Sequence, residues 1–271
     1  MNATNISTDY QKNYDAISEV DLEEPIQPEW YLNAQADRFL KKLRLKGDED
    51  VCDIGVGSGK FLERLSKDHA GRMVGIDLCQ SYLDHVKSCC GDKVELIRAN
   101  AENLNIDREF DVIVSTDVLE HVINVGDFLD SVFQALKPGG RFIVRTPYLE
   151  DYTVYSTRRG CPYEFVHLRS FSKSTLKIIL AGAGFIPKRH WFDGHTANRL
   201  RFFSTTTMGV LSAMRRASQR REAVDVQGGG ESPVEPALPN YERMIAKLPG
   251  PIANFLFNPI EISMEGLRPV E

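Results

Sequence analysis

Residues 51–60 read VCDIGVGSGK, and the rest of the chain is arranged around this stretch. A short apolar run leads into Asp53, and glycines follow at alternate positions, Gly55, Gly57 and Gly59. The pattern predicts a buried strand that ends in a tight turn and opens a helix. Glycine tolerates positive φ, and its missing Cβ lets a ligand lie against the backbone. We therefore expect a ligand at this turn, with a purely structural bend as the alternative.

The spacing of the glycines differs from the dinucleotide fingerprint. That fingerprint is G-x-G-x-x-G, followed about 20 residues later by an acidic residue for the ribose. Lys60 stands where the third glycine would be, and Asp53 precedes the first glycine. The ligand therefore need not carry a pyrophosphate, and a nicotinamide-dependent oxidoreductase is disfavoured.

The composition is that of an ordinary globular protein. The 271 residues carry a net charge of −5, and 42% of them are hydrophobic. Because there is no overall basic field to recruit nucleic acid, we expect a small-molecule or lipid-linked partner. The sequence shows no signal-peptide pattern, no run of about 18 apolar residues and no metal-ligand spacing of its cysteines. We expect a cytoplasmic protein.

Strands and helices alternate along most of the chain. Helical spacing of apolar residues is seen at 29–43. After the first strand, apolar runs predict further strands at residues 73–77, 94–99, 110–116, 141–146 and 186–192. Such alternation predicts a mostly parallel sheet with helices on both faces. A seventh, antiparallel strand is sought at residues 259–264, PIEISM.

Polar residues follow four of these strands, at the edge where ligands of parallel sheets bind. They are the glycine turn, Asp77, residues 100–102 and residues 117–121. The carboxylate of Asp77 can accept both hydroxyl hydrogens of an adenosine ribose. Its alternative role is to cap the next helix. We expect the four loops to share one crevice.

These motifs resemble those of the class I S-adenosylmethionine-dependent methyltransferases, over residues 30–193. The segments that carry the resemblance are DIGVGSG, GID, NAENL, FDVIVSTDVLEHV and LKPGGRFIV, in that order. The resemblance implies a Rossmann-like, doubly wound, mostly parallel seven-stranded sheet with helices on both faces. It also implies S-adenosylmethionine as the cofactor.

The resemblance further implies roles for cofactor-binding residues. The glycine turn holds the methionine part of the cofactor, Asp53 orients it and Asp77 binds the ribose hydroxyls. Ala101 offers its backbone N–H to adenine, and Asp117 is counted with the cofactor-binding set. Asn100 departs from the Asp that many members carry, but its amide oxygen still accepts a hydrogen bond from the adenine amino group.

Methyl transfer needs the acceptor atom held in line with the methyl carbon and the sulfur. Positioning contributes about 7–11 kcal/mol, whereas general base catalysis contributes about 3–5 kcal/mol. His121 is our candidate base, because a histidine near its unperturbed pKa of about 6.5 accepts a hydroxyl proton near neutral pH. Packing or helix capping is the alternative role of His121.

A second candidate lies in HLRSFS, which resembles an element before the sixth helix of small-molecule O- and N-methyltransferases. We expect His167 on the acceptor side, where Arg169 suits a carboxylate. Alternatively, Ser172 of this segment only caps the next helix.

The segment DVLEH resembles one that quinone-precursor O-methyltransferases associate with a divalent ion. Asp117, Glu120 and His121 offer oxygen and nitrogen ligands. Three ligands that are close in sequence do not make a metal site, and we assign no metal.

Three regions are expected along the chain. Residues 1–28 form a flexible N-terminal arm, or alternatively one that caps the domain and folds over a site, in which Tyr10 and Tyr14 pack or contact substrate. Residues 29–195 form the S-adenosylmethionine-binding domain. Residues 196–271 form an appendage with a disordered linker at about 222–239. Within the appendage, residues 200–221 are expected to pack over the acceptor site, and a basic amphipathic helix in peripheral contact with a membrane is the alternative.

We therefore predict a methyltransferase that acts on an oxygen of a small-molecule or lipid-linked acceptor. Transfer to nitrogen or carbon, including that of quinone-type rings, is one alternative. A non-catalytic S-adenosylmethionine-binding partner protein is another. The sequence sets neither the oligomeric state nor the acceptor.

Overall fold

The computed structural model describes residues 3–25, 27–104, 106–152, 166–200 and 257–270. Two compact units are distinguished, residues 1–191 with 262–271 and residues 192–261. The site described below lies within the first unit. The amphipathic segment at 200–221 and the linker at 222–239 fall outside the described residues. Within the described residues, no helix combines the length and apolar character needed to cross a membrane.

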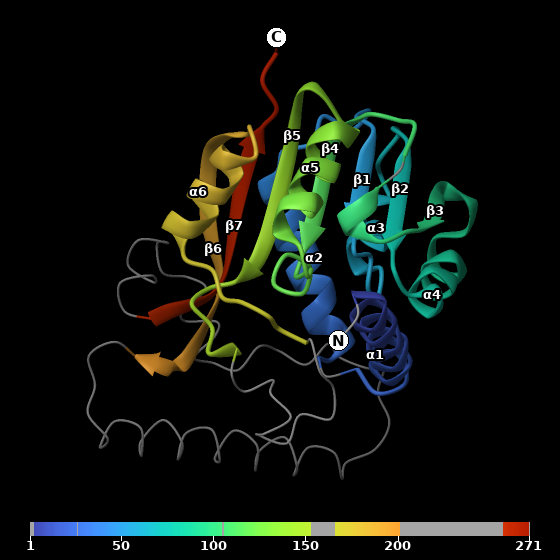
Figure 1. Cartoon of the computed structure of the whole chain (residues 1–271). Helices are drawn as coiled ribbons and strands as arrows, with labels where there is room; N and C mark the ends of the chain where they lie inside the picture. Colours follow the sequence, from blue (N-terminus) through green and yellow to red (C-terminus); the bar gives the residue numbers. More distant parts are fainter. Residues whose placement is uncertain (1–2, 26, 105, 153–165, 201–256, 271) are drawn as a thin grey trace, which may run out of the picture. The chain divides into compact units, whose positions relative to one another are not determined.

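One sheet of seven strands has the order β3-β2-β1-β4-β5-β7-β6. The strands are β1 Val51–Ile54, β2 Met73–Asp77, β3 Val94–Arg98, β4 Phe110–Thr116, β5 Leu136–Pro147, β6 Ile186–Leu200 and β7 Phe257–Leu267. The first five pair in parallel. β7 leads to the C-terminus at the end of the sheet where β5 begins, so it runs opposite to β5 (Figure 1). The expected seventh strand is thus confirmed.

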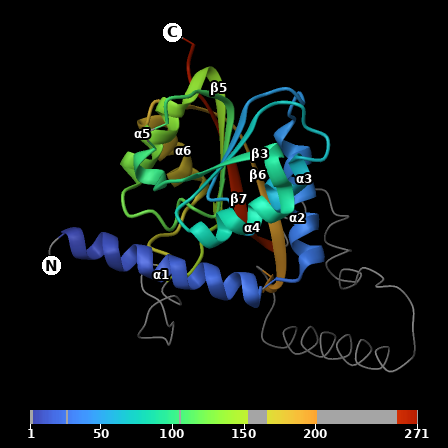
Figure 2. The ribbon, with the colours of Figure 1, turned by 90° about the vertical axis from the view of Figure 1, so that its right-hand side faces the viewer.

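Helices cover both faces of the sheet. α2 Glu29–Leu43, α3 Lys60–Leu65 and α4 Gln80–Cys90 lie on one side, and α5 Val125–Ala135 and α6 Lys173–Gly182 lie on the other (Figure 2). Short 3-10 turns occupy Gly91–Lys93 and Ala101–Asn103. The doubly wound, Rossmann-like fold expected from the sequence is confirmed.

The core explains why the strands read as continuous apolar runs. All four residues of β1 are buried, as are all five of β2. A parallel strand that is covered on both faces has no solvent side to fill with polar residues. Phe39 and Leu43 of α2 and Leu62 of α3 belong to one apolar cluster with residues of β1, β2 and β4. From β1 the sheet grows toward β3 on one side and, starting with β4, toward the other, so the strand order reverses between β1 and β4, and a crevice forms at such a switch point.

The N-terminal region differs from the flexible arm that the sequence predicts, because Ala3–Glu23 form a helix, α1. Its contacts to the domain include polar ones. The hydroxyl of Ser18 lies 2.6 Å from that of Ser81, and Tyr82 donates a hydrogen bond to Asp21 at 2.9 Å. Such contacts leave no apolar stripe in the sequence, and tertiary contacts stabilise most helices.

Candidate active site

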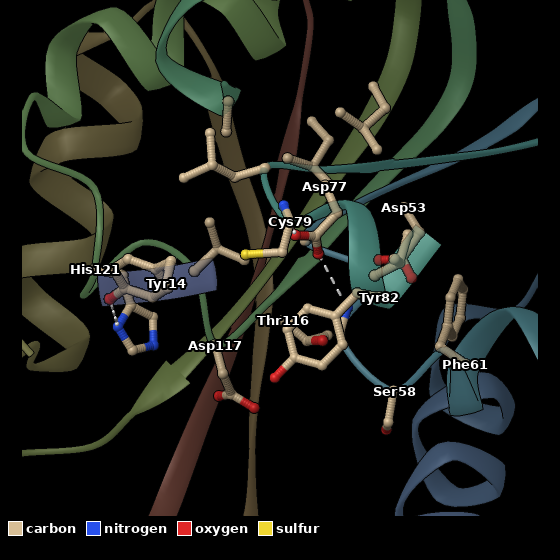
Figure 3. Close-up of a pocket in the computed structure, with 18 of the residues that line it drawn as sticks. Tyr14, Asp53, Ser58, Phe61, Asp77, Cys79, Tyr82, Thr116, Asp117 and His121 are labelled. Atoms are coloured by element: carbon tan, nitrogen blue, oxygen red, sulfur yellow. Dashed lines mark hydrogen bonds between the residues drawn. The ribbon is translucent and has the colours of Figure 1, made fainter. Parts of the chain in front are cut away.

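A cavity of about 390 Å³ opens at the carboxyl ends of β1, β2 and β4. This volume lies in the range of small-molecule sites, about 300–1,000 Å³. Most of the expected site residues line it, namely Asp53, Gly55, Gly57, Asp77, Asn100, Ala101, Asp117 and His121. Gly59 and His167 are not among the lining residues. The carboxyl groups of Asp53 and Asp77 lie at one end of the cavity, and Tyr14 and His121 lie at the other (Figure 3).

The three glycines of the turn have different structural roles. All adopt positive φ, at 81° for Gly55, 49° for Gly57 and 73° for Gly59. A Cβ on Gly55 would overlap the side chain of Val118, and one on Gly59 would meet Val86. A Cβ on Gly57 would meet nothing within 4 Å. Close packing therefore requires two of the glycines, and the third leaves open space at the cavity wall.

Asp77 ties two loops of the crevice together. Its Oδ1 accepts the backbone N–H of Cys79 at 2.9 Å, and its Oδ2 accepts that of Gly57 at 3.1 Å. Burial raises the pKa of Asp77, although these backbone N–H groups act in the opposite direction. Each carboxylate oxygen has a second lone pair for a ligand hydroxyl. The capping role at the start of α4 and the expected ribose role are therefore compatible.

Asp53 is buried at the cavity wall. The residue is 1% exposed, and its Oδ1 has no hydrogen-bond partner among the described residues. Burial and the neighbouring Asp77 raise the pKa of Asp53 well above its usual range. A buried carboxyl without a partner is costly. A cationic ligand group beside Asp53 would remove that cost.

Asp117 follows β4 in a left-handed conformation, with φ 57°. Its backbone N–H donates to the carbonyl of Arg145 at 2.9 Å, and its Oδ2 pairs with the Arg145 guanidinium. Oδ1 of Asp117 is buried with no partner in the described part of the chain. Arg145 lines the cavity, and the sequence analysis missed it. An arginine inside the apolar run RFIVRT was the available signal.

His121 is held by its Nδ1. This atom lies 2.7 Å from the Tyr14 hydroxyl and hydrogen-bonds to the carbonyl of Val166. Burial and, to a smaller extent, His167 lower the pKa of His121 to about 4. The expectation of a pKa near 6.5 was therefore wrong, because the sequence does not show how deeply the imidazole is buried.

The ring of His167 lies next to that of His121. The two ring centroids are 4.6 Å apart, and the rings meet edge-on. Nδ1 of His167 is 2.5 Å from Oε2 of Glu150. Arg169 of the same segment donates to the backbone carbonyls of Leu119, Val122 and Ile123. Ser172 accepts the backbone N–H of Thr175 and caps α6, as the alternative reading had it.

The methyltransferase domain family matches residues 29–187 of this chain. The chain belongs to this family.

Curated relatives agree with this membership. A protein of Mycolicibacterium smegmatis named "Probable S-adenosylmethionine-dependent methyltransferase/" is 31% identical over 137 residues, 50% of this chain and 51% of that protein. A ubiquinone biosynthesis O-methyltransferase of Bradyrhizobium diazoefficiens is 33% identical over 114 residues, covering 41% of this chain and 44% of the relative. A tRNA U34 carboxymethyltransferase of Pseudoalteromonas translucida is 33% identical over 131 residues, 46% and 40% of the two chains.

A solved structure supports the fold. The methyltransferase in the complex with the Haloferax volcanii Trm112 methyltransferase activator has a TM-score of 0.61 and 17% identity, covering 97% of this chain and 98% of that one. By contrast, the chain spans about half or less of the length of the curated relatives above. The resemblance to class I S-adenosylmethionine-dependent methyltransferases is thus confirmed at the level of the family.

The residues of this methyltransferase fit the cofactor of its family. S-adenosylmethionine carries cationic sulfonium and ammonium groups and a ribose with two hydroxyls. Oδ1 of Asp53, which has no partner among the described residues, the carboxylate of Asp77 and the open space at Gly57 fit these groups in charge and hydrogen bonding. The individual residue roles remain predictions.

On the expected adenine side of the cavity, Asn100 and Glu102 each have a structural role as well, and the predicted contacts to adenine stay predictions. Oδ1 of Asn100 accepts the backbone N–H of Glu102 at 2.9 Å and so caps a 3-10 turn. The carboxylate of Glu102 in turn accepts the backbone N–H groups of Ile123 and Asn124, at 2.8 and 2.9 Å. Glu102 therefore links this turn to the start of α5, a role that no local sequence signal indicated.

The ligand trio that DVLEH suggested is not assembled, because Asp117 pairs with Arg145. Instead, Glu120, His121 and His167 each bring one donor atom into a cluster within 4.8 Å. Burial and Asp117 raise the pKa of Glu120 well above its usual range, and Thr146 donates to it at 3.0 Å. That the enzyme needs no metal stays a prediction.

Proposed function

We propose that this methyltransferase transfers the methyl group of S-adenosylmethionine to an oxygen of a small-molecule or lipid-linked acceptor. One observation carries the proposal: a neutral histidine, His121, lies in the wall of the cavity, whose other end holds the carboxyl of Asp53, with an Oδ1 that has no partner in the described part of the chain. A proton acceptor at this place is of use to a hydroxyl acceptor, which loses a proton when it is methylated. The O-methyltransferase among the relatives supports the same acceptor atom.

In the proposed mechanism, residues of the chain bind the cofactor and accept the proton of the acceptor. When bound, the cofactor supplies an electrophilic methyl group on a sulfonium. Asp77 binds the ribose hydroxyls, Asp53 balances positive charge and the turn at Gly57 leaves room for the methionine part. His121 takes the hydroxyl proton on Nε2 as the acceptor oxygen bonds to the methyl carbon and the bond from that carbon to sulfur breaks, so that the electron pair stays on sulfur and the demethylated cofactor leaves as a neutral thioether. The carbonyl of Val166, at Nδ1, then stabilises the imidazolium.

Acceptors other than nucleic acid fit the charges around the cavity. Lys60 and Arg145 both line it, but carboxylates neutralise both of them. Lys60 pairs with Glu29 at 2.9 Å and Glu63 at 2.8 Å, and Arg145 pairs with Asp117. Proteins that bind nucleic acid gain most of their affinity from cations that neutralise phosphates. We therefore infer a small or lipid-linked acceptor, although a tRNA-modifying enzyme is among the relatives.

Calorimetric titration tests the cofactor part of the proposal. Purified protein is titrated with S-adenosylmethionine, its demethylated product and NADH, in wild type and Asp77→Ala. We expect micromolar adenosyl binding, a scale set by about −8 kcal/mol, that weakens in the variant. Preference for NADH would refute the cofactor assignment.

Acceptor screening tests the transfer step. Phenols, catechols, aliphatic alcohols, amines and short tRNA stem-loops are offered with methyl-labelled cofactor. His121→Asn is the matched variant, because the Asn amide can still donate to Val166 but lacks a group in the place of Nε2. The proposal is supported if labelled methyl is transferred to a hydroxyl and if His121→Asn transfers less of it than wild type does. Transfer to tRNA or to amines only would contradict it.

A further inference from the structure

We propose that Tyr14 is a positioning residue for His121: together with the Val166 carbonyl, its hydroxyl holds the imidazole in the tautomer that leaves Nε2 unprotonated. An effect of Tyr14 on the rate of methyl transfer would rest on the proposed function. The tautomer of His121 does not depend on that function, and it can be measured without any acceptor.

The tautomer follows from the partners of Nδ1. A backbone carbonyl only accepts hydrogen bonds, so the nitrogen that faces Val166 O must carry a proton. A neutral imidazole has one N–H, and which nitrogen bears it is set by the bond that this nitrogen makes. Nε2 is therefore the lone-pair nitrogen. Oε1 of Glu120 lies 3.9 Å from Nε2, beyond hydrogen-bond distance.

Tyr14 adds a third member to this arrangement. Its hydroxyl donates to Val166 O at 3.1 Å, and its oxygen lies 2.7 Å from Nδ1, where it can share the N–H. The two rings stand at 84° with centroids 5.7 Å apart, so the phenol meets the imidazole edge-on (Figure 3). Burial raises the pKa of Tyr14, which keeps the hydroxyl protonated as the donor. Rotation of the imidazole about its ring axis would break both contacts.

The helix that carries Tyr14 is itself fixed on the domain. Besides the contacts of Ser18 and Asp21, Gln11 donates to the carbonyl of Leu78 at 3.4 Å. Tyr10, one turn before Tyr14, lies against its ring with centroids 4.6 Å apart. α1 passes across the end of the sheet where the crevice opens (Figure 2). The N-terminal helix therefore helps to set the orientation of the proton acceptor.

Tyr10 provides a matched control. Its hydroxyl donates to the backbone carbonyl of His121 at 3.4 Å and also hydrogen-bonds with the Tyr14 side chain, whereas the 2.7 Å contact to Nδ1 is made by Tyr14. Tyr10→Phe and Tyr14→Phe thus each remove one hydroxyl from the same helix next to the same histidine. Only the second removes a partner of Nδ1.

The experiment is ¹⁵N NMR of the full chain with labelled histidine, without ligands and at neutral pH. We expect wild type and Tyr10→Phe to show His121 with Nδ1 protonated and Nε2 unprotonated, and Tyr14→Phe to show both nitrogens averaged between the two tautomers. With an acceptor found in the screen, kcat of Tyr14→Phe should fall about 10-fold while KM and cofactor affinity stay within about twofold. Tyr10→Phe should keep the wild-type tautomer of His121.

Two results would overturn the inference. A wild-type spectrum with the proton on Nε2 does so without any variant, which keeps the test decisive even if Tyr14→Phe fails to fold. A Tyr14→Phe spectrum and kcat equal to wild type does so as well. A tautomer that changes as expected in a protein that methylates no hydroxyl would instead refute the proposed function and leave the positioning role intact.

Discussion

Oδ2 of Asp77 accepts the backbone N–H of Gly57 at 3.1 Å, which joins the end of β2 to the glycine turn after β1. One carboxylate thereby shapes the loop expected to hold the methionine part while it offers lone pairs to the ribose. We therefore expect the binding of the two halves of the cofactor to be linked through this side chain. The consequence is testable by substitution.

Asp77→Ala removes a charged acceptor from the ligand and from two backbone donors. Hydrogen bonds to charged groups are worth about 1.5–3 kcal/mol, so we expect cofactor affinity to fall about 10- to 100-fold. Calorimetry measures this. Asp84→Ala, which removes an exposed carboxylate from α4, is the matched control and should bind as wild type does. Equal affinity of Asp77→Ala and wild type would contradict the ribose role.

Cofactor binding is expected to release a proton from Asp53. Its pKa lies well above the usual value in the ligand-free protein, because the carboxyl is buried next to Asp77. A cation bound beside it stabilises the charged form and lowers that pKa. Between the lowered and the raised pKa, binding therefore releases up to about one proton. Titrations in buffers of different ionisation enthalpy measure the number.

Asp53→Asn provides the comparison for this release. The variant should bind with a smaller buffer-dependent heat than wild type, because an amide at position 53 has no proton to lose in this range, and any remaining dependence reports other groups such as Asp77. A wild-type heat that is independent of the buffer would show that Asp53 is already ionised before binding, or that the cation lies elsewhere.

The features that could be predicted from the sequence are local ones. The runs that became β1, β2 and β4 are continuous and apolar because parallel strands are buried on both faces, and three alternating glycines announce a turn with positive φ. The features that could not be predicted depend on partners far away in sequence. Examples are the Asp117–Arg145 pair and the link from Glu102 to the start of α5.

Dependence on partners far away in sequence also explains why the helix α1 and the lowered pKa of His121 were not predicted. α1 makes polar contacts such as that of Ser18 with Ser81, so its sequence reads as a polar arm. The pKa of His121 is set by how deeply the imidazole is buried, which depends on α1 and on the loop at Val166. Neither can be read from residues 117–121 alone.

His121 should make stability depend on pH in a defined window. Its pKa falls from 6.5 to about 4 on folding, so between these values the unfolded chain binds more protons than the native one. The contribution of His121 is fully present above pH 6.5 and is lost as pH falls toward 4, up to about 3 kcal/mol. Urea unfolding of wild type and His121→Asn across this range measures it.

The difference between the two proteins isolates this one group, since the other titrating residues are shared. We expect the free energy of unfolding of His121→Asn to fall less steeply between pH 6.5 and 4. The acid limb of kcat should likewise lie near the lowered pKa. If the free energies of unfolding of the two proteins change in parallel with pH, or if kcat falls with an apparent pKa near 6.5, the imidazole is more hydrated than the structure indicates.

Gly55→Ala and Gly57→Ala should separate packing from ligand binding. A Cβ on Gly55 would overlap Val118, and positive φ adds strain, so we expect a loss of about 2–4 kcal/mol in the free energy of unfolding. At Gly57 the space is open, and the strain alone costs about 1 kcal/mol. Its added methyl group, however, stands at the wall of the cavity and should weaken cofactor binding more than it destabilises the fold. Chemical denaturation and calorimetry of both variants measure the two quantities, and normal cofactor affinity in Gly57→Ala would show that the ligand does not lie against this part of the turn.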